Sequence, residues 1–191
     1  MYNTLAECPV PCLQHEGELQ EFLEIYKEMQ PKKVLEIGSF YGGTLWFFIK
    51  NNPDKLETLI SLDMLIPQTD KRYNEMIESR SKWNDWCPFL LDFYTFEGNS
   101  RDQSIIETIK KDNYLNEIDL LHIDGDHSYE GVKADYENFK SLVKPGGIIV
   151  FHDVVGIETV ARFWNELKEQ FPESFRTISH ENGWGIGILQ V

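Results

Sequence analysis

The sequence predicts an α/β fold with one doubly wound, mostly parallel sheet. Short apolar runs are followed by segments of helical period five times in succession, and two strand-like runs separated by a short turn end the chain. Such alternation is typical of a parallel sheet with helices on both faces. The last two runs are expected to pair antiparallel, because so short a connection cannot make a parallel crossover.

An N-terminal helix precedes the first strand. Its apolar residues recur at helical spacing from Leu19 to Met29, and Pro31 stops it. In the first half of the chain, strands are then expected at residues 34–37, 59–62 and 93–96, with helices at residues 44–49, around residues 70–83, and from an N-cap at Ser100 through Ile109.

The second half continues the alternation and closes with a hairpin. Strands are expected at residues 118–123, 148–151, 175–179 and 184–189, helices at residues 129–143 and 160–171, and a turn at residues 144–147. We expect a single domain over residues 1–191, with a helical extension at residues 1–31.

The composition excludes several classes of partner. The 191 residues carry 18 Lys and Arg against 32 Asp and Glu, a formal net charge of −14. Such a surface repels nucleic-acid phosphates and anionic membranes, so we expect neither as a partner. No apolar run approaches the roughly 20 residues of a membrane span, and no signal peptide is visible. The three cysteines, Cys8, Cys12 and Cys87, lack zinc spacing and indicate reduced thiols in a cytoplasmic protein.

Polar residues follow each of the first five strands. They are Gly38, Asp63, Gly98 with Asn99, Asp124, and His152 with Asp153. In open α/β sheets, ligands bind outside the carboxyl ends of the strands. The sequence therefore predicts a ligand site at this edge of the sheet.

The segment after the first strand has the spacing Gly-x-x-x-Gly-Gly, at Gly38, Gly42 and Gly43. Glycine lets a ligand approach the backbone, and the following helix start offers free N–H groups. A turn for close packing of strand and helix is the alternative. Asp63, at the end of the next strand, can accept hydrogen bonds from both hydroxyls of a ribose, a feature that several nucleoside-binding folds share.

Five segments together resemble class I S-adenosylmethionine-dependent methyltransferases. They are residues 34–38 (Val-Leu-Glu-Ile-Gly), 62–63, 96–100, 118–124 and 142–147. The run Ile123–Val132, which contains Asp-Gly-Asp-His-Ser-Tyr, is similar to a narrower group that includes macrocin-type and cephalosporin-pathway O-methyltransferases. The resemblance covers about residues 32–155 and implies a seven-stranded, Rossmann-like sheet with a reversed last strand.

The resemblance also implies where the cofactor, S-adenosylmethionine, binds. Glu36 and Gly38 would lie beside its methionine part, Asp63 would bind the ribose, and Gly98, Asn99 and Ser100 would lie near the adenine. The remaining expected cofactor contacts are Ser39, Gly42, Met64 and Asp124.

A second group, Asp124, His152 and Asp153, has two interpretations. In metal-dependent relatives, acidic residues at these strand ends bind a divalent cation such as Mg²⁺. Here His152 stands where those relatives have a carboxylate, and an imidazole favours a softer metal or none. Without a metal, Asp124 would bond backbone N–H groups or the cofactor amine, and His152 would line the acceptor pocket.

His127 is the first candidate for a general base. It follows Asp124 by three residues, and an imidazole suits the removal of a hydroxyl proton near neutral pH. The alternative is an exposed polar residue without a role. The expected catalytic residues are His127, Asp124 and His152, with His152 competing for the role of base.

We therefore expect transfer of a methyl group from S-adenosylmethionine to a small-molecule acceptor, at a hydroxyl. A nicotinamide-dependent oxidoreductase stays open as an alternative, although the Gly-x-Gly-x-x-Gly spacing is absent. A non-catalytic binding protein that keeps the fold is a second alternative. Residues 66–88 would either cover the acceptor as a lid or pack in the core. The identity of the acceptor and the formation of a homo-oligomer are left open.

Overall fold

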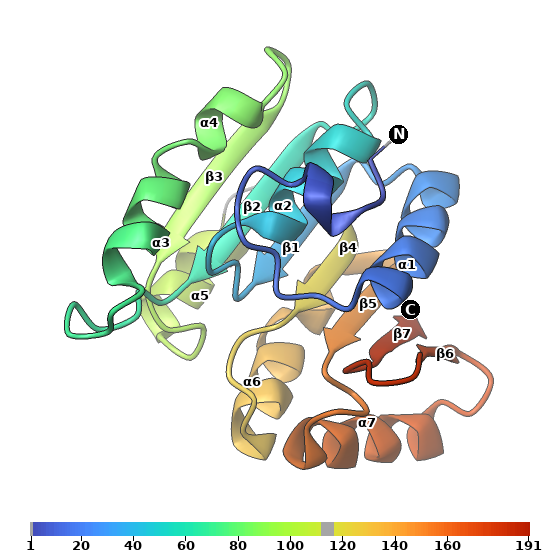
Figure 1. Cartoon of the computed structure of the whole chain (residues 1–191). Helices are drawn as coiled ribbons and strands as arrows, with labels where there is room; N and C mark the ends of the chain where they lie inside the picture. Colours follow the sequence, from blue (N-terminus) through green and yellow to red (C-terminus); the bar gives the residue numbers. More distant parts are fainter. Residues whose placement is uncertain (1, 112–116) are drawn as a thin grey trace.

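Seven strands form one sheet in the computed structural model, which describes residues 2–111 and 117–191 (Figure 1). The strands lie in the order β3-β2-β1-β4-β5-β7-β6. Their bounds are β1 Lys33–Ile37, β2 Thr58–Asp63, β3 Asp92–Glu97, β4 Ile118–Ile123, β5 Val143–His152, β6 Phe175–Ile178 and β7 Ile186–Gln190. Strands β1 to β5 pair in parallel, and β7 runs antiparallel to both β5 and β6. The predicted fold class is confirmed, including the reversed last strand.

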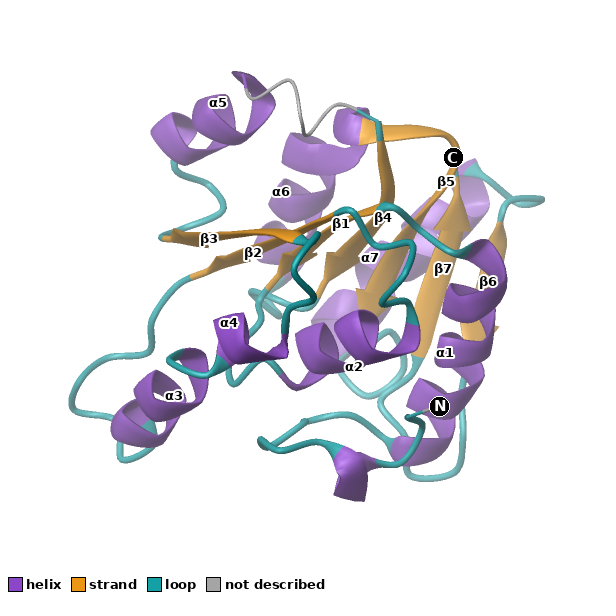
Figure 2. Ribbon diagram, turned by 90° about the horizontal axis from the view of Figure 1, so that it is seen from above, coloured by secondary structure: helices purple, strands orange, loops and turns teal. Residues whose placement is uncertain are grey.

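Helices cover both faces of the sheet (Figure 2). Residues of α1 (Glu16–Met29), α2 (Gly43–Asn51), α3 (Tyr73–Arg80) and α4 (Trp83–Trp86) pack in one apolar cluster, and residues of α5 (Gln103–Lys111), α6 (Tyr129–Phe139) and α7 (Glu158–Gln170) pack in the other. Two short 3₁₀ helices complete the elements, η1 (Leu5–Glu7) and η2 (Lys140–Leu142). None of the helices in the described ranges is long and apolar enough to cross a bilayer.

Successive side chains of a strand point to opposite faces of the sheet, so each strand contributes residues to both apolar clusters. Val34 and Leu59 face the cluster of α1 and α2, whereas Leu35 and Ile60 face the cluster of α5 and α6. All four are fully buried, and burial of such a side chain stabilises the fold by roughly 1.5–3 kcal/mol. Because both faces are covered, the strands read as continuous apolar runs rather than alternating ones.

The register of the parallel strands brings the polar strand ends together. Ile37 of β1 pairs with Leu62 of β2 and with Ile123 of β4, and Ile123 pairs with Phe151 of β5. The next residue of each strand therefore stands in one row along the sheet edge. This row consists of Gly38, Asp63, Asp124 and His152.

Three local predictions differ from the structure. The helix around residues 70–83 is shorter and is followed by a separate helix, α4. Val143 begins β5 instead of ending a helix, because the η2 turn ends the helical segment. The predicted turn at residues 144–147 lies inside β5 as a bulge, since Val143 pairs with Ile118 and Ile148 pairs with Leu120.

The predicted N-cap of α5 is also wrong. Asp102, directly before Gln103, accepts a hydrogen bond from the Ser104 N–H at 2.9 Å. A cap side chain reaches only the first turn of its helix. Ser100 lies two residues further upstream, in the cavity wall described below.

Candidate functional site

A cavity of about 1150 Å³ opens at the carboxyl ends of the parallel strands. Most of the residues predicted from the sequence line it, namely Gly38, Ser39, Asp63, Met64, Gly98, Asn99, Ser100, Asp124, His127, His152 and Asp153. Small-molecule sites usually occupy about 300–1,000 Å³, so this cavity is slightly larger than that range. Glu36 and Gly42 are not among the residues that line it.

Gly38 lies against the backbone that follows β4. Its φ is +89°, and a Cβ at this position would lie 2.0 Å from the backbone oxygen of Asp124. Close packing of the chain therefore excludes a side chain here, while Gly38 also faces the cavity. Close packing against the backbone after β4 is therefore one reason for this glycine, and the approach of a ligand to its backbone stays a prediction. Gly42 has a φ of +85° and lies against the Trp83 ring, away from the cavity wall.

Asp63 is held from two directions. Its Oδ2 accepts hydrogen bonds from the Phe40 N–H and from Arg80 Nη2, each at 2.5 Å. Arg80 also donates from Nε to the Phe40 carbonyl oxygen at 3.2 Å. Burial raises the pKa of Asp63, and the nearby Arg80 charge offsets this only in part. The structure thus fixes this carboxylate beside residues 38–43, which we call the glycine loop.

Glu36 lies beneath the cavity instead of in its wall. It is 1% exposed, and its Oε1 is 3.1 Å from Nδ1 of His122, which is equally buried. Burial raises the pKa of Glu36. The His122 ring stacks on Phe22 of α1, so this pair joins the sheet to the N-terminal helix. The expected contact of Glu36 with the methionine part of a cofactor stays a prediction.

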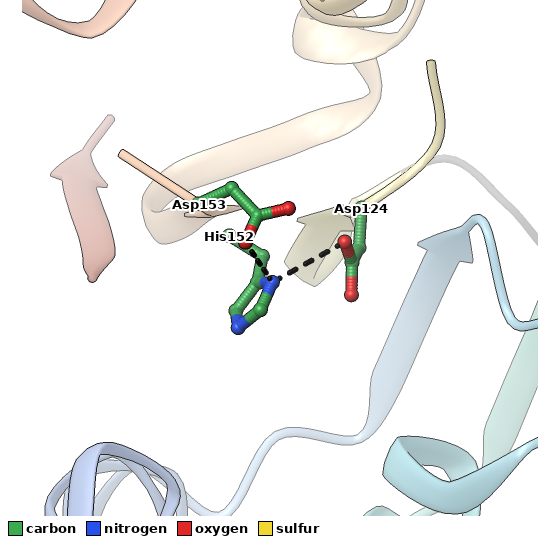
Figure 3. A group of neighbouring side chains, drawn as sticks. All are labelled: Asp124, His152 and Asp153. Carbon is green, nitrogen blue, oxygen red and sulfur yellow. Dashed lines mark ion pairs between the residues drawn. The ribbon is translucent and has the colours of Figure 1, made fainter. Parts of the chain in front are cut away.

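Two histidines and two aspartates meet at the other end of the cavity, and Figure 3 shows three of them, Asp124, His152 and Asp153. Nδ1 of His152 lies 3.1 Å from Asp153 Oδ1 and 3.4 Å from Asp124 Oδ1. Nε2 of His127 lies 3.1 Å from Asp153 Oδ2 and 3.4 Å from Asp124 Oδ1. We call Asp124, His127, His152 and Asp153 the acid–histidine cluster.

Mutual attraction sets the charges in this cluster. Burial disfavours a charged His152, but Asp124 and Asp153 outweigh it and raise the pKa of His152 to about 10. A hydrogen bond with Asp124 raises the pKa of His127. Burial works against the charge of Asp124 as well, yet His152 and His127 hold the pKa of this carboxyl well below its usual range. The cluster therefore balances two carboxylates with imidazolium charge.

The same residues fit a divalent cation. One ligand atom each from Asp124, His152 and Asp153 lies within 4.8 Å of the others. Two carboxylates with one imidazole form a donor set that transition metals accept more readily than Mg²⁺ does. The geometry is compatible with both interpretations of the cluster.

Several cavity residues were not foreseen. Gln14 donates from Nε2 to Asp124 Oδ2 at 3.2 Å, and Trp184 lines the cavity from the β6–β7 connection. Nothing near Gln14 in the sequence marks it, whereas glycines at 183 and 185 flank Trp184 and were a signal. Phe40 and Tyr41 also line the cavity, and Tyr41 is buried in the apolar cluster as well.

Residues 66–88 lie mainly at the Asp63 end. Ile66 and Arg72 reach the cavity, while Trp83 and Trp86 pack in the core. The alternative of core packing therefore holds for these two tryptophans, and a lid formed by other residues of the segment stays a prediction. Cys87 donates to the Trp83 carbonyl oxygen at 3.4 Å, and all three cysteines are free thiols.

Comparison with known proteins decides the family. The profile of a methyltransferase domain family matches residues 35–154, more than half of the chain. The chain belongs to this family. The methyltransferase domain includes the glycine loop, Asp63 and the acid–histidine cluster.

Individual relatives are more distant. The chain is 26% identical to the rhamnosyl O-methyltransferase of Mycobacterium leprae over 155 residues, covering 80% of this chain and 62% of that protein. It is 32% identical over 119 residues to an uncharacterized protein of Acanthamoeba polyphaga mimivirus, covering 62% of this chain and 50% of that one. The chain therefore spans less than two thirds of the length of these curated relatives.

Solved structures agree in fold. A methyltransferase of Podospora anserina solved with SAH bound has a TM-score of 0.68 at 15% identity, covering 100% of this chain and 88% of that one. An O-methyltransferase of Bacillus cereus in complex with SAH has a TM-score of 0.65 at 16% identity, covering 97% and 86%. At such identities, the likeness shows a shared fold alone.

Proposed function

We propose that this protein transfers a methyl group from S-adenosylmethionine to the hydroxyl of a small-molecule acceptor. The observation that carries the proposal is that one cavity joins the Gly38–Asp63 end to the acid–histidine cluster. The family match supports methyl transfer, and relatives that are named O-methyltransferases support oxygen as the atom methylated. The run Ile123–Val132 supports a place near the macrocin-type and cephalosporin-pathway enzymes.

The Asp63 end would hold the cofactor. Asp63 would accept hydrogen bonds from the ribose hydroxyls, with the Gly38 backbone and Ser39 along the methionine part. Gly98, Asn99 and Ser100, after β3, would bind the adenine, and Met64 would pack beside it. The net charge of −14 favours a cationic sulfonium ligand.

The acid–histidine cluster would prepare the acceptor. When bound, S-adenosylmethionine supplies an electrophilic methyl group, so orientation and proton removal are the tasks left to the protein. His127 is 45% exposed at the cavity, and its Nε2 is held by Asp153 and Asp124. Its Nδ1 is therefore the nitrogen that would take the acceptor proton. His152 is buried, with Nδ1 between the two carboxylates, which suits a supporting role better than that of the base.

A divalent cation is the alternative way to activate the acceptor. Asp124, His152 and Asp153 would hold it, and a bound cation would lower the pKa of an acceptor hydroxyl. Excess chelator decides the question. Loss of methyl transfer, with recovery on adding Mg²⁺ or Mn²⁺, would establish the metal site. Full activity in excess chelator would exclude it, and only the metal-free mechanism with a histidine base would remain.

Calorimetric titration tests the cofactor. S-adenosylmethionine and S-adenosylhomocysteine should bind and raise the melting temperature, with a stabilisation of about 2.7 kcal/mol at 100 times the dissociation constant. NAD should do neither. A flat titration with folded protein contradicts the proposal, NAD binding with hydride transfer would support the oxidoreductase, and cofactor binding without methylation of any acceptor would support the binding protein.

A further inference from the structure

A buried carboxylate of the N-terminal helix organises the loop that joins β6 to β7. Glu18 of α1 is 0% exposed. Its Oε1 accepts from the His180 N–H at 3.0 Å and the Gly185 N–H at 3.1 Å, and its Oε2 accepts from the Trp184 N–H and the Gly185 N–H, both at 3.0 Å. Three backbone N–H groups of one loop thus converge on a single side chain more than 160 residues away in the sequence.

The loop at residues 180–185 is shaped to surround this carboxylate. A Cβ on Gly183 would lie 2.1 Å from Glu18 Oε1, and Gly185 has a φ of +83°. Backbone N–H groups that converge in this way form a concave anion-binding nest. Here the anion is part of the protein, so the nest fixes the loop to α1.

The same loop is bonded to the segment that follows the acid–histidine cluster. The Trp184 carbonyl oxygen accepts from the Val155 N–H at 2.9 Å and the Gly156 N–H at 2.8 Å, and the Gly185 carbonyl oxygen accepts from the Val154 N–H at 3.2 Å. Asp153 directly precedes this segment. Glu18 therefore fixes the position of Trp184 relative to the cluster.

Trp184 presents an indole at the cavity. It lines the cavity and is 48% exposed, whereas the other four tryptophans are at most 8% exposed. Its ring rests on Gly156, where a Cβ would lie 2.5 Å from an indole carbon. An exposed aromatic face with a backbone support behind it is suited to stack on a flat ligand.

The strand order places this indole away from the cofactor end. Asp63 ends β2, and Trp184 precedes β7, so β1, β4 and β5 lie between them in the sheet. The cluster at the ends of β4 and β5 lies between the two. A ligand that stacks on Trp184 would reach the cluster from the side opposite to the ribose.

We propose that Trp184 is an acceptor-binding side chain for a neutral acceptor whose hydroxyl is carried on a flat ring, and that Glu18 is the positioning residue that holds it. This rests on the proposed function, because it assumes that the acceptor occupies the end of the cavity beside the acid–histidine cluster. We expect a neutral acceptor because the net charge of −14 disfavours an anionic one.

Three variants test this proposal, and a fourth, Trp184→Phe, is the reference for fluorescence. Glu18→Gln replaces one acceptor oxygen by a donor amide that faces N–H groups, Trp184→Ala removes the indole, and Glu28→Gln is the control at an exposed position of the same helix. Each is titrated with S-adenosylhomocysteine by calorimetry. Phenol binding to the loaded protein is then followed by saturation-transfer NMR, with tert-butanol as a hydroxyl compound without a ring. Acrylamide quenching of Trp184 fluorescence is obtained by difference from Trp184→Phe.

The expected result separates the two ends of the cavity. Phenol binding should weaken at least tenfold in Trp184→Ala and in Glu18→Gln, with S-adenosylhomocysteine affinity unchanged within twofold and tert-butanol unaffected. Trp184 should become more quenchable in Glu18→Gln, and Glu28→Gln should match the wild type.

Other outcomes overturn the proposal. Phenol that fails to bind the wild type, or binds Trp184→Ala equally well, rejects the stacking role. Unchanged quenching in Glu18→Gln rejects the positioning role, as does a parallel loss of S-adenosylhomocysteine binding, which would indicate general damage to the fold. If S-adenosylhomocysteine does not bind the wild type, the proposed function fails, and the quenching comparison still judges Glu18 separately.

Discussion

The two ends of the cavity use the same element, an aspartate directly after a parallel strand, in different electrostatic settings. Asp63 and Asp124 are similarly buried, with side chains 13% and 18% exposed. Burial raises the pKa of Asp63 although Arg80 contacts it, whereas two histidines hold the pKa of Asp124 below its usual range in spite of burial. The position in the sheet is shared, and the side chains packed over it decide the charge.

This difference matches the task proposed for each end. The Asp63 carboxylate is bonded by Arg80 and by backbone N–H groups, and its two oxygens can accept further hydrogen bonds from ribose hydroxyls. A network of two carboxylates and two imidazoles can take up a proton without leaving a buried charge unpaired. The predictions below test where this contrast holds.

Gly38→Ala should have the largest effect, because it acts on both ends at once. The new Cβ would meet the Asp124 backbone oxygen, at a φ of +89°. Strain and overpacking each cost about 1–3 kcal/mol, so we expect a loss of about 2–6 kcal/mol in unfolding free energy and no measurable cofactor binding. Urea denaturation and calorimetry measure the two.

Gly146→Ala is the matched control. Gly146 has a φ of +82°, but among the described residues, its chain neighbours aside, no atom lies within 4 Å of its Cβ position. It should show the cost of the backbone conformation without the clash. Equal losses in the two variants would mean that the contact between β1 and β4 does not matter.

His127→Ala tests the cluster end alone. Removal of a general base typically lowers turnover by about 10²–10⁴-fold. We expect that loss in single-turnover methyl transfer, with cofactor affinity unchanged. His180→Ala, at another exposed histidine, should retain turnover. Near-normal turnover in His127→Ala, beside an inactive His152→Ala, would transfer the role of base to His152.

Asp135 of α6 sharpens the contrast as a third buried carboxylate. It is 0% exposed, and its Oδ2 lies 3.1 Å from where a Cβ of Gly125 would be. Burial raises the pKa of Asp135 to about 6 from an ordinary value of 3.8, because Ser100 and Arg101 offset this effect only in part. With neither a histidine nor an arginine dominating its surroundings, it should behave as burial alone dictates.

The pH dependence follows from the sign of that shift. Asp135 binds its proton more tightly in the folded state than in the unfolded state. Its protonation therefore stabilises the folded state fully below about pH 4, and this stabilisation is lost as the pH rises through about 6. A shift of about two units corresponds to at most about 3 kcal/mol. The stability of Asp135→Asn relative to the wild type should therefore increase between pH 4 and pH 7 in urea denaturation. A difference independent of pH would contradict the raised pKa.

Asp63→Asn should have the smallest effect, since one acceptor oxygen remains. A hydrogen bond to a charged group contributes about 1.5–3 kcal/mol, and we expect the lower value, a roughly tenfold weaker cofactor affinity by calorimetry. Glu97→Gln is the control, because Glu97 pairs with Asp63 in register on β3 but is exposed and is not among the cavity residues. Unchanged affinity in Asp63→Asn would remove Asp63 from the proposed ribose site.

Local pattern predicted much of the fold. The apolar runs at residues 34–37, 59–62 and 118–123 are strands within one residue of their predicted bounds, because short buried strands between glycines and aspartates are encoded in neighbouring residues. The predicted ends of elements were wrong where tertiary packing competes with local propensity. Val143 fits the helical pattern, yet it pairs with Ile118 as the first residue of β5.

The sequence by itself determined that Gly38, Asp63, Asp124 and His152 would share one edge, because parallel strands in register bring their carboxyl ends together. The tertiary structure alone decided which partners they meet. Arg80 reaches Asp63, Gln14 reaches Asp124, and Glu18 holds the Trp184 loop, all from segments distant in the chain. It also placed Glu36 below the cavity beside His122. The physical reason is that periodicity records which face of an element is buried, whereas the path of the chain and the packing of helices on the sheet decide what that face contacts.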